Sequence, residues 1–330
     1  MKNIGNERMI MTISQFNIVV LIIALISTLS FAIISNYDYD GIVLINAQTI
    51  DSDDTSNNTN IIKLDNIPSK QVKVEDIDIS YKIFGKGDPI LLIMGYAGSM
   101  YGWDPVFLKG LSTNHTVIVF DHRGIGNTTV GSKNFTIDQF AADSAGLLDV
   151  LKINKSDVLG YSMGGMITQQ LTLNYPDKVD DLVIYASFCG GNQSIPPNPE
   201  LFKQTTNLSA SADDIKKRIV PLFFTSHWIR QNPDYLEKFA SFVFPSIDIL
   251  ERQGEALFSW EGVCDQLKDI SQDTLVVTGT DDLVLSSANS MILIEKIPGT
   301  WLAQFKDGGH ALMSQYPESL SAIVNTFLDN

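Results

Sequence analysis

The sequence predicts an α/β protein built on a doubly wound, mostly parallel β-sheet, with an inserted helical lid and an N-terminal membrane-spanning or signal helix. Three observations lead to this prediction. Short, continuously apolar runs, typical of strands buried on both faces, alternate with amphipathic segments of helix length. One long interval, residues 192–270, interrupts the alternation. An uncharged apolar run, residues 18–35, stands apart near the N-terminus.

The composition is that of a globular protein with ample material for one large domain and appendages. Of the 330 residues, 44% are hydrophobic and 18% are charged, and the formal net charge is −15. An acidic surface repels phosphate backbones, so we expect no nucleic-acid partner. No cluster of cysteine and histidine has zinc-ligand spacing, so we expect neither a metal nor a cofactor. For Cys189 and Cys264, the sequence favours two separate buried thiols, with a disulfide as the alternative if the domain lies outside the cell.

The apolar run at residues 18–35 predicts export. Its flanking charges are basic before it and acidic after it: Lys2 and Arg8, then Asp38 and Asp40. This asymmetry predicts that the N-terminus lies inside and the rest of the chain outside. The run is near the lower length limit for spanning a bilayer and longer than the apolar core of most cleaved signals. We therefore expect a membrane anchor with the folded domain outside, or a secreted protein if cleavage after Ala47 removes residues 1–47.

A linker and an edge hairpin follow. Residues 48–62 are polar and acidic and show no periodicity, so they are expected to form a flexible linker. The folded domain then covers residues 63–330. It begins with alternating apolar and polar residues at 72–83, which predict an antiparallel hairpin that turns near residues 75–76 at the edge of the sheet.

The core strands are predicted where the sequence is apolar without interruption. These runs are residues 90–94, 116–120, 156–159, 182–186, 275–278 and 301–305. Between them, residues 137–151 and 163–175 have the spacing of amphipathic helices. Residues 192–270 show only helical patches separated by prolines and polar residues. An insertion of this size between two core strands is a candidate lid over an active site. Its many aromatic residues are expected mainly to pack the lid onto the core, with an apolar substrate pocket as the functional alternative.

The sequence Gly-Tyr-Ser-Met-Gly at residues 160–164 places a serine where a short strand meets a helix. A nucleophile on such a sharp turn has strained backbone angles, and the glycines on both sides relieve crowding with neighbouring elements. The turn also places the hydroxyl at a helix N-terminus, where backbone N–H groups stabilise negative charge. Ser162 is therefore the candidate nucleophile.

A serine hydroxyl needs a general base, and the base needs an orienting acid. His310 is the candidate base, because it lies in a loop after the last apolar run and before a final helix. The other histidines precede the nucleophile or lie in the lid: His115, His122 and His227. The acid should close the preceding strand, where Asp281 and Asp282 both offer a carboxylate. The loop at residues 187–191, where some hydrolases carry the acid, has none.

A tetrahedral oxyanion needs two preorganised N–H donors. The residue directly after the nucleophile, Met163, is expected to provide one of them. The glycine-rich loop at residues 95–99 is expected to provide the other, from the backbone of Tyr96.

From about residue 72 to residue 330, the chain resembles the α/β-hydrolase superfamily, in particular its lid-bearing serine esterase and haloperoxidase-like branch. The resemblance lies in five segments in the family's order: Met-Gly-Tyr-Ala-Gly-Ser at 94–99, Asp-His-Arg-Gly-Ile-Gly at 121–126, Gly-Tyr-Ser-Met-Gly-Gly at 160–165, Gly-Thr-Asp-Asp at 279–282 and Gly-Gly-His at 308–310. In that family the acid is the fourth residue of a G-x-x-D segment, which implies Asp282. The segment at 121–126 is a structural signature there, so it receives no catalytic role. Many members have His-Gly where this chain has Met94-Gly95, a departure that should alter the support of the loop more than its backbone donor.

The resemblance implies a serine hydrolase that cleaves carboxylic esters or lactones through an acyl-enzyme intermediate, with a small-molecule substrate. A serine nucleophile disfavours haloalkane dehalogenase and epoxide hydrolase chemistry, for which this fold uses an aspartate. Two alternatives use the same triad: a cofactor-free haloperoxidase or perhydrolase, and a C–C bond hydrolase. A non-catalytic binding protein on this fold is a further alternative, which the intact set of residues disfavours.

Overall fold

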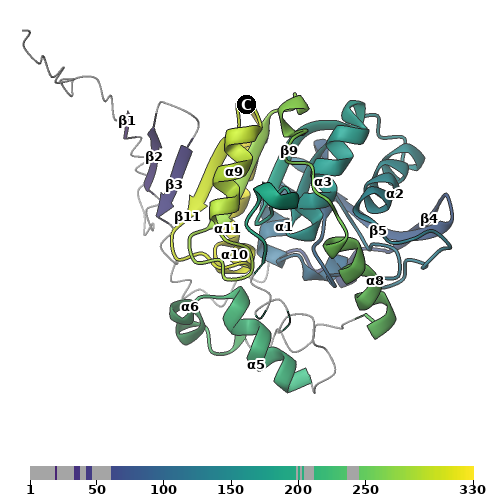
Figure 1. Cartoon of the computed structure of the whole chain (residues 1–330), viewed down its shortest axis with the longest axis horizontal. Coiled ribbons are helices and arrows are strands. Elements are labelled where there is room, and N and C mark those ends of the chain that lie inside the picture. The colour runs from purple at the N-terminus through teal and green to yellow at the C-terminus, as the bar shows by residue number, and fades with distance from the viewer. Residues whose placement is uncertain are drawn as a thin grey trace, which may run out of the picture.

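The described residues form one mixed sheet of eleven strands, and eight of these, β4 to β11, form the centre of the protein (Figure 1). The computed structural model describes residues 19–20, 33–37, 42–46, 61–197, 200, 203, 212–235 and 245–330. The eight central strands are β4 (Lys70–Val74), β5 (Ile77–Gly85), β6 (Asp88–Ile93), β7 (His115–Phe120), β8 (Ser156–Tyr161), β9 (Val179–Tyr185), β10 (Thr274–Gly279) and β11 (Trp301–Phe305). Their spatial order is β11-β10-β9-β8-β6-β7-β5-β4. Strands β6 to β11 pair in parallel, whereas β5 pairs antiparallel with both β7 and β4.

Helices cover both faces of this sheet. The α-helices are α1 (Pro105–Leu111), α2 (Ile137–Val150), α3 (Met163–Asn174), α5 (Ala212–Phe223), α6 (Ser226–Gln231), α8 (Ile247–Phe258), α9 (Ala288–Lys296), α10 (Leu312–Gln315) and α11 (Pro317–Leu328). Short 3₁₀ turns are η1 (Leu64–Asn66), η2 (Met100–Gly102), η3 (Pro176–Lys178), η4 (Gly191–Gln193) and η5 (Leu267–Asp269). Helices α2, α3 and α9 contribute to one buried cluster, and α1, α10 and α11 contribute to the other. This is the doubly wound arrangement that the sequence predicts.

Strand β6 shows why the uninterrupted apolar runs become core strands. Successive side chains of a strand point to opposite faces of the sheet. Accordingly, Ile90 and Leu92 belong to one buried cluster, and Leu91 and Ile93 belong to the other. A strand covered by helices on both faces needs an apolar residue at every position, so its sequence shows no alternation.

The predicted core elements are confirmed with small shifts at their ends. The hairpin of β4 and β5 turns at residues 75–76, and the helices expected at 137–151 and 163–175 are α2 and α3. Each predicted core strand overlaps one of β6 to β11. Glu75 has a φ of +47°, which gives the tight turn between the two antiparallel strands.

The N-terminal prediction meets the structure only in part. Within the expected helix at residues 18–35, the described ends are strands: β1 (Val19–Val20) and the start of β2 (Ile33–Tyr37). The expectation of a helix is wrong for these described residues. Strand β2 pairs with β3 (Ile42–Asn46), and β3 pairs in parallel with β11. The backbone hydrogen bonds of β2 and β3 are therefore made within the sheet and not within a helix. The rest of that range, most of the expected linker at 48–62 and the residue before the cleavage point, Ala47, lie outside the described residues. In the part of the chain that the structure covers, no helix is long and apolar enough to cross a bilayer.

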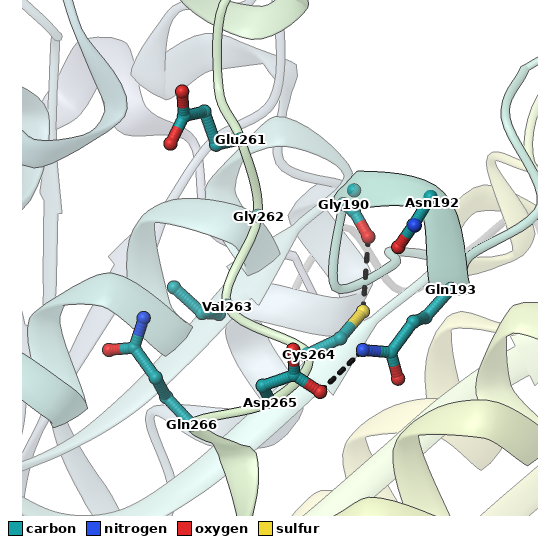
Figure 2. Close-up of a pocket in the computed structure, with 10 residues that line it drawn as sticks. Gly190, Asn192, Gln193, Glu261, Gly262, Val263, Cys264, Asp265 and Gln266 are labelled. Atoms are coloured by element: carbon teal, nitrogen blue, oxygen red, sulfur yellow. Dashed lines mark hydrogen bonds between the residues drawn. The ribbon is translucent and has the colours of Figure 1, made fainter.

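Between β9 and β10 lies the helical insertion, residues 192–270, whose helices α5, α6 and α8 are in the lower part of the view in Figure 1. It contains α5, α6 and α8, and no strand among its described residues. The two ends of this insertion meet around a small polar cavity of about 120 Å³ (Figure 2). The cavity is lined by residues 190–193 from one end and residues 261–266 from the other. The insertion therefore leaves and rejoins the core at one place.

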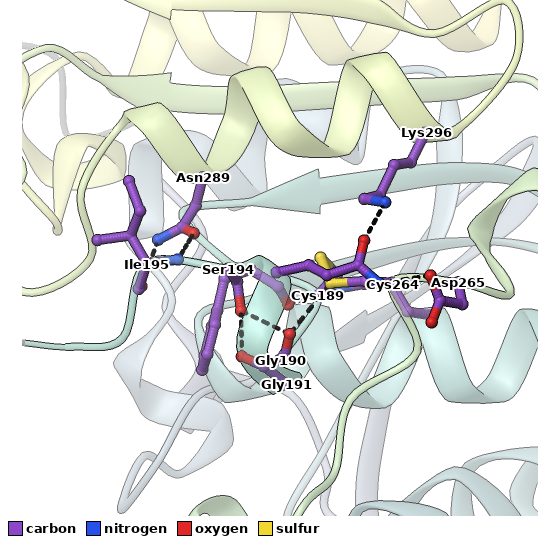
Figure 3. Close-up of a disulfide and its surroundings, with 12 residues drawn as sticks. Cys189, Gly190, Gly191, Ser194, Ile195, Cys264, Asp265, Asn289 and Lys296 are labelled. Atoms are coloured by element: carbon purple, nitrogen blue, oxygen red, sulfur yellow. Dashed lines mark hydrogen bonds between the residues drawn. A yellow bond between two sulfur atoms is a disulfide. The ribbon is translucent and has the colours of Figure 1, made fainter.

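A disulfide joins Cys189 to Cys264 at this point (Figure 3), so the expectation of two separate thiols is wrong. The backbone N–H of Val263 donates a hydrogen bond to the Cys189 carbonyl, 2.8 Å away. This bond aligns the two segments and places the cysteine Cα atoms 5.0 Å apart, within the range that a disulfide spans. The bridge therefore ties the two ends of the insertion together.

Replacing both cysteines with serine, C189S/C264S, is expected to lower the free energy of unfolding by about 2–5 kcal/mol. The reason is that the bridge closes a loop across a sequence separation of 75 residues and so restricts the unfolded chain. Urea denaturation of the native protein and the double variant, each with and without reductant, measures the effect. The native protein should lose stability in reductant and the double variant should not. Equal midpoints for the oxidised native protein and the variant would contradict the prediction.

Candidate active site

Ser162 occupies the sharp turn between β8 and α3. Its φ of +57° and ψ of −118° lie in a region that side-chain-bearing residues rarely adopt. The glycines on either side allow this turn for steric reasons. A Cβ at Gly160 would lie 2.2 Å from the Gly164 carbonyl oxygen, and a Cβ at Gly164 would lie 2.0 Å from the Ile93 carbonyl oxygen. Only glycine at these two positions lets β8, the turn at Ser162 and β6 approach one another so closely.

Hydrogen bonds hold the strained backbone of Ser162 from several sides. Its N–H donates to the Tyr185 carbonyl at 2.9 Å. Its own carbonyl accepts from the Gly165 N–H at 2.9 Å and from the Ser187 hydroxyl at 2.8 Å. A strained conformation persists where the surrounding structure over-determines it, as these bonds from β9 and the following loop do here.

The structure brings Ser162, His310 and Asp282 into one hydrogen-bonded chain. Nε2 of His310 lies 3.0 Å from Oγ of Ser162, and Nδ1 of His310 lies 2.8 Å from Oδ2 of Asp282. A carboxylate can only accept, so Nδ1 carries the imidazole proton. Nε2 is then left to accept the hydrogen bond that the Ser162 hydroxyl donates. Both His310 and Asp282 are buried, which protects the chain from solvent.

The two candidate acids lie in different surroundings. Oδ1 of Asp282 accepts from the N–H groups of Val284 and Leu285 at 2.8 and 2.9 Å, so the second oxygen is aimed at His310. Asp281 is exposed, and its backbone N–H donates to the Gly308 carbonyl at 2.9 Å. Asp281 therefore ties the loop after β10 to the histidine loop, and Asp282 contacts the imidazole.

Tyr185, at the end of β9, holds the histidine loop and is a residue that the sequence analysis missed. Its hydroxyl donates to the His310 carbonyl at 2.9 Å and accepts from the Met313 N–H at 3.0 Å. The side chain is fully buried, and burial raises its pKa well above the ordinary value, so it remains a neutral donor. In the sequence Tyr185 is one more large residue of an apolar run, and nothing local marks its partner.

The variant Y185F is expected to lower about tenfold the kcat of a reaction that depends on His310, and to lower the free energy of unfolding by about 1–3 kcal/mol. The change leaves the buried His310 carbonyl and Met313 N–H without partners, which loosens the loop that carries the imidazole. The matched control is Y316F, because the Tyr316 hydroxyl donates to the Lys306 carbonyl at 3.3 Å and does not contact the imidazole loop at His310. Steady-state kinetics and urea denaturation of both variants test this; equal kcat values in the two variants would refute it.

The loop after β6 lies directly against the nucleophile. A Cβ at Gly95 would lie 3.0 Å from Cβ of Ser162, so the next residue, Tyr96, begins beside the serine. On the other side, Met163 is the first residue of α3 and its N–H has no acceptor within the helix. The two residues predicted to donate to an oxyanion therefore flank Ser162.

The segment at residues 121–126 binds the chain on both sides of the loop after β6. Nε2 of His122 donates to the Met94 carbonyl at 2.9 Å, and Oδ1 of Asp121 accepts from the Met100 N–H at 2.7 Å. Burial lowers the pKa of His122 and raises that of Asp121 to about 6. Arg123 forms two bonds of 2.7 Å to the Asp143 carboxylate. The first two contacts hold backbone, and the third joins the segment to α2 through side chains, which agrees with the structural role expected for the segment.

The helical insertion contacts the histidine side of the site through Phe223, the last residue of α5. Its ring meets the His310 ring edge to face, with centroids 5.2 Å apart. Its carbonyl accepts from the Ala311 N–H at 3.0 Å. The insertion thus packs directly on the imidazole and its loop.

Comparison with known proteins places these features in context. The family described as alpha/beta hydrolase fold matches residues 88–315. A protein of Azorhizobium caulinodans, provisionally named carbamate hydrolase RutD, is 30% identical over 258 residues, covering 76% of this chain and 95% of that protein. The 3-oxoadipate enol-lactonase 2 of Acinetobacter baylyi is 25% identical over 263 residues, covering 77% and 94%. The crystal structure of the enol-lactonase from Burkholderia xenovorans LB400 shares the fold, with a TM-score of 0.69 and 22% identity over 79% of this chain and 100% of that chain.

Proposed function

The chain belongs to the alpha/beta hydrolase fold family, and from this premise we propose that it is a serine hydrolase that cleaves carboxylic esters or lactones of small molecules. The observation that carries the proposal is the hydrogen-bonded chain from Ser162 through His310 to Asp282, built on a strained strand-to-helix turn. Nucleophile, base and orienting acid lie within hydrogen-bond reach, which is the geometry that acyl transfer requires.

In the first half of the proposed reaction, Oγ of Ser162 attacks the substrate carbonyl carbon while Nε2 of His310 takes the hydroxyl proton. Asp282 stabilises the imidazolium that results and keeps its orientation. The backbone N–H groups of Met163 and Tyr96 hold the negative oxygen of the tetrahedral intermediate. As that intermediate collapses, the C–O bond breaks and His310 protonates the leaving alkoxide. An ester releases an alcohol, whereas a lactone opens and keeps its hydroxyl on the acyl group.

In the second half, water replaces the alcohol. His310 removes a proton from the water, whose oxygen attacks the acyl carbon held on Ser162. Collapse of the second intermediate releases the carboxylic acid and returns the proton to Oγ of Ser162. The names of the two relatives favour this chemistry, because enol-lactone and carbamate hydrolysis both begin with attack on a carbonyl next to a heteroatom.

The helical insertion, residues 192–270, is proposed to act as the lid of this site. The contact of Phe223 with the His310 ring supports this, because it places an insertion side chain directly over the base. A lid in this position excludes water from the imidazole and shapes the acyl pocket.

We also propose that the folded domain is exported. The charge asymmetry around residues 18–35 and the Cys189–Cys264 disulfide support this, because structural disulfides persist mainly in oxidising compartments. Fractionation of producing cells, followed by protease treatment of intact cells, tests the proposal. Protein outside the cell or protease-accessible on it supports export, and release into the medium distinguishes secretion from anchoring. Protein found only in the reduced form inside the cell would overturn it.

The function is tested with the purified full-length chain, a fluorophosphonate probe and a substrate panel. The panel contains p-nitrophenyl esters of increasing acyl length, γ-lactones, a carbamate, and an ester with hydrogen peroxide to detect peracid formation. Labelling that maps to Ser162, with fastest turnover of an ester or lactone, is expected. Faster peracid formation would favour the perhydrolase alternative. A folded protein that is not labelled would overturn the proposal in favour of a binding protein.

A further inference from the structure

We propose that Gln253 of helix α8 is a positioning residue for the oxyanion loop, which we define as residues 95–98. On this view the helical insertion completes the oxyanion hole as well as covering it. The inference rests on the proposed function, because it assigns a role within the same site. It concerns a contact across 156 residues of sequence, between the insertion and the loop after β6.

The central contact joins the Gln253 side chain to the loop backbone. Oε1 of Gln253 accepts a hydrogen bond from the Ala97 N–H at 2.9 Å, and the Gln253 side chain is fully buried. Ala97 directly follows Tyr96, the proposed donor, and adopts a φ of +61°. A residue with a Cβ holds this left-handed conformation only where its surroundings impose it. The bond from α8 is such a constraint, and it fixes the peptide unit next to the donor.

A second hydrogen bond joins the same helix to the same loop. The Tyr96 hydroxyl donates to the Leu250 carbonyl at 3.0 Å. Leu250 lies three residues before Gln253, so both contacts come from one face of α8. Burial raises the pKa of Tyr96 to about 12, so the phenol remains protonated and able to donate. Helix α8 therefore holds the loop by the side chain of Tyr96 and by the backbone of Ala97.

If residue 253 served only to stabilise the fold, a glutamine would be a poor choice there. The Ala97 N–H can only donate, so the amide oxygen must face it and Nε2 must point away. Nε2 of Gln253 is buried and makes no hydrogen bond to any of the described residues. A buried unpaired donor costs about 1–3 kcal/mol. A methionine would fill a similar volume without that cost, so the amide is explained by the acceptor that it presents to the oxyanion loop.

The expected consequence of losing this contact is specific to the transition state. The Met163 donor is fixed by helix α3 and stays in place, whereas the Tyr96 donor depends on the loop. Loss of one oxyanion donor lowers kcat by about 10²–10³. A loosened donor should have a smaller effect, so we expect Q253M to lower kcat by about 10–100-fold, with KM changed by less than about twofold. A boronic acid inhibitor, which forms a tetrahedral adduct, should lose affinity by a similar factor.

The experiment compares Q253M, Q253E and Q170M in the full-length chain. Q253E keeps an acceptor of the same length, in the neutral acid form that burial favours, and should recover most of the lost kcat. Q170M is the matched control, because Oε1 of Gln170 accepts from Nε1 of Trp260 at 3.2 Å and so also joins the insertion to the core. Q170M breaks that bond without contacting the oxyanion loop and should keep kcat within about twofold.

The outcomes separate this inference from the proposed function. The wild-type protein is first labelled with the fluorophosphonate; absence of labelling defeats the proposed function itself. If the wild type is labelled, a Q253M variant with the kcat of Q170M, or with raised KM and unchanged kcat, overturns the positioning role alone. If Q253M does not fold, as judged by circular dichroism, Q253L replaces it. Leucine also removes the acceptor for the Ala97 N–H, so an unchanged kcat and boronate affinity in that variant would overturn the inference.

Discussion

The variant S162A is expected to lose about 10⁶-fold in kcat for ester hydrolysis and all covalent labelling by a fluorophosphonate. The reason is that Oγ of Ser162 is the atom proposed to form the acyl bond, and Nε2 of His310 lies 3.0 Å from it. With the methyl group of alanine in its place, only the oxyanion donors and binding remain, and they support a slow attack by water. Ester turnover and gel-based labelling, each at matched protein concentration, measure the loss.

The matched control for this prediction is S144A. Ser144 is also a buried serine, but its hydroxyl donates to the Phe140 carbonyl within α2 at 2.8 Å. We expect S144A to retain labelling and turnover. Hydrolysis by S162A at more than about one hundredth of the wild-type rate would mean that another residue is the nucleophile.

The second large effect is expected from D282N, with a loss of about 10⁴-fold in kcat. Oδ1 of Asp282 is held by the N–H groups of Val284 and Leu285, so an asparagine here must keep its oxygen on that side. Its NH₂ group then faces Nδ1 of His310 and donates to it. The imidazole proton is thereby forced onto Nε2, which can no longer accept the proton of Ser162.

The neighbouring variant D281N provides the comparison. The Asp281 carboxylate is exposed, and its contact with the histidine loop is made by the backbone, which the substitution keeps. We expect kcat within about twofold of the wild type. Large loss in D281N together with near-normal turnover in D282N would transfer the role of the acid to Asp281.

Much of the fold follows from local patterns. The uninterrupted run at residues 90–94 requires burial on both faces, and β6 indeed sends alternate side chains into the two clusters. The turn at Ser162 is equally local, because the two flanking glycines are within two residues of it. The positions of Asp282 and His310 after adjacent strands explain why their order in the chain was informative: β10 and β11 pair in parallel, so their carboxyl ends meet.

Local sequence patterns were misleading where contacts between segments distant in the chain decided the structure. The ends of the apolar run at residues 18–35 have the composition of a helix as well as of a strand. Pairing of β1 with β2 and of β2 with β3 made the described ends strands. The two thiols gave no local sign of pairing, because the backbone bond between Val263 and Cys189 that aligns them joins segments far apart in sequence.

By itself, the sequence determined the order of strands and helices, the turn that carries Ser162 and the candidates for base and acid. These depend on periodicity and steric crowding over a few residues. Only the tertiary structure decided that Cys189 pairs with Cys264, that Tyr185 holds the loop of His310 and that Gln253 binds the oxyanion loop. Each of these contacts joins residues 75 or more positions apart. A single donor, acceptor or thiol carries no mark of its partner, because the partner is selected by how the sheet, the helices and the insertion pack together.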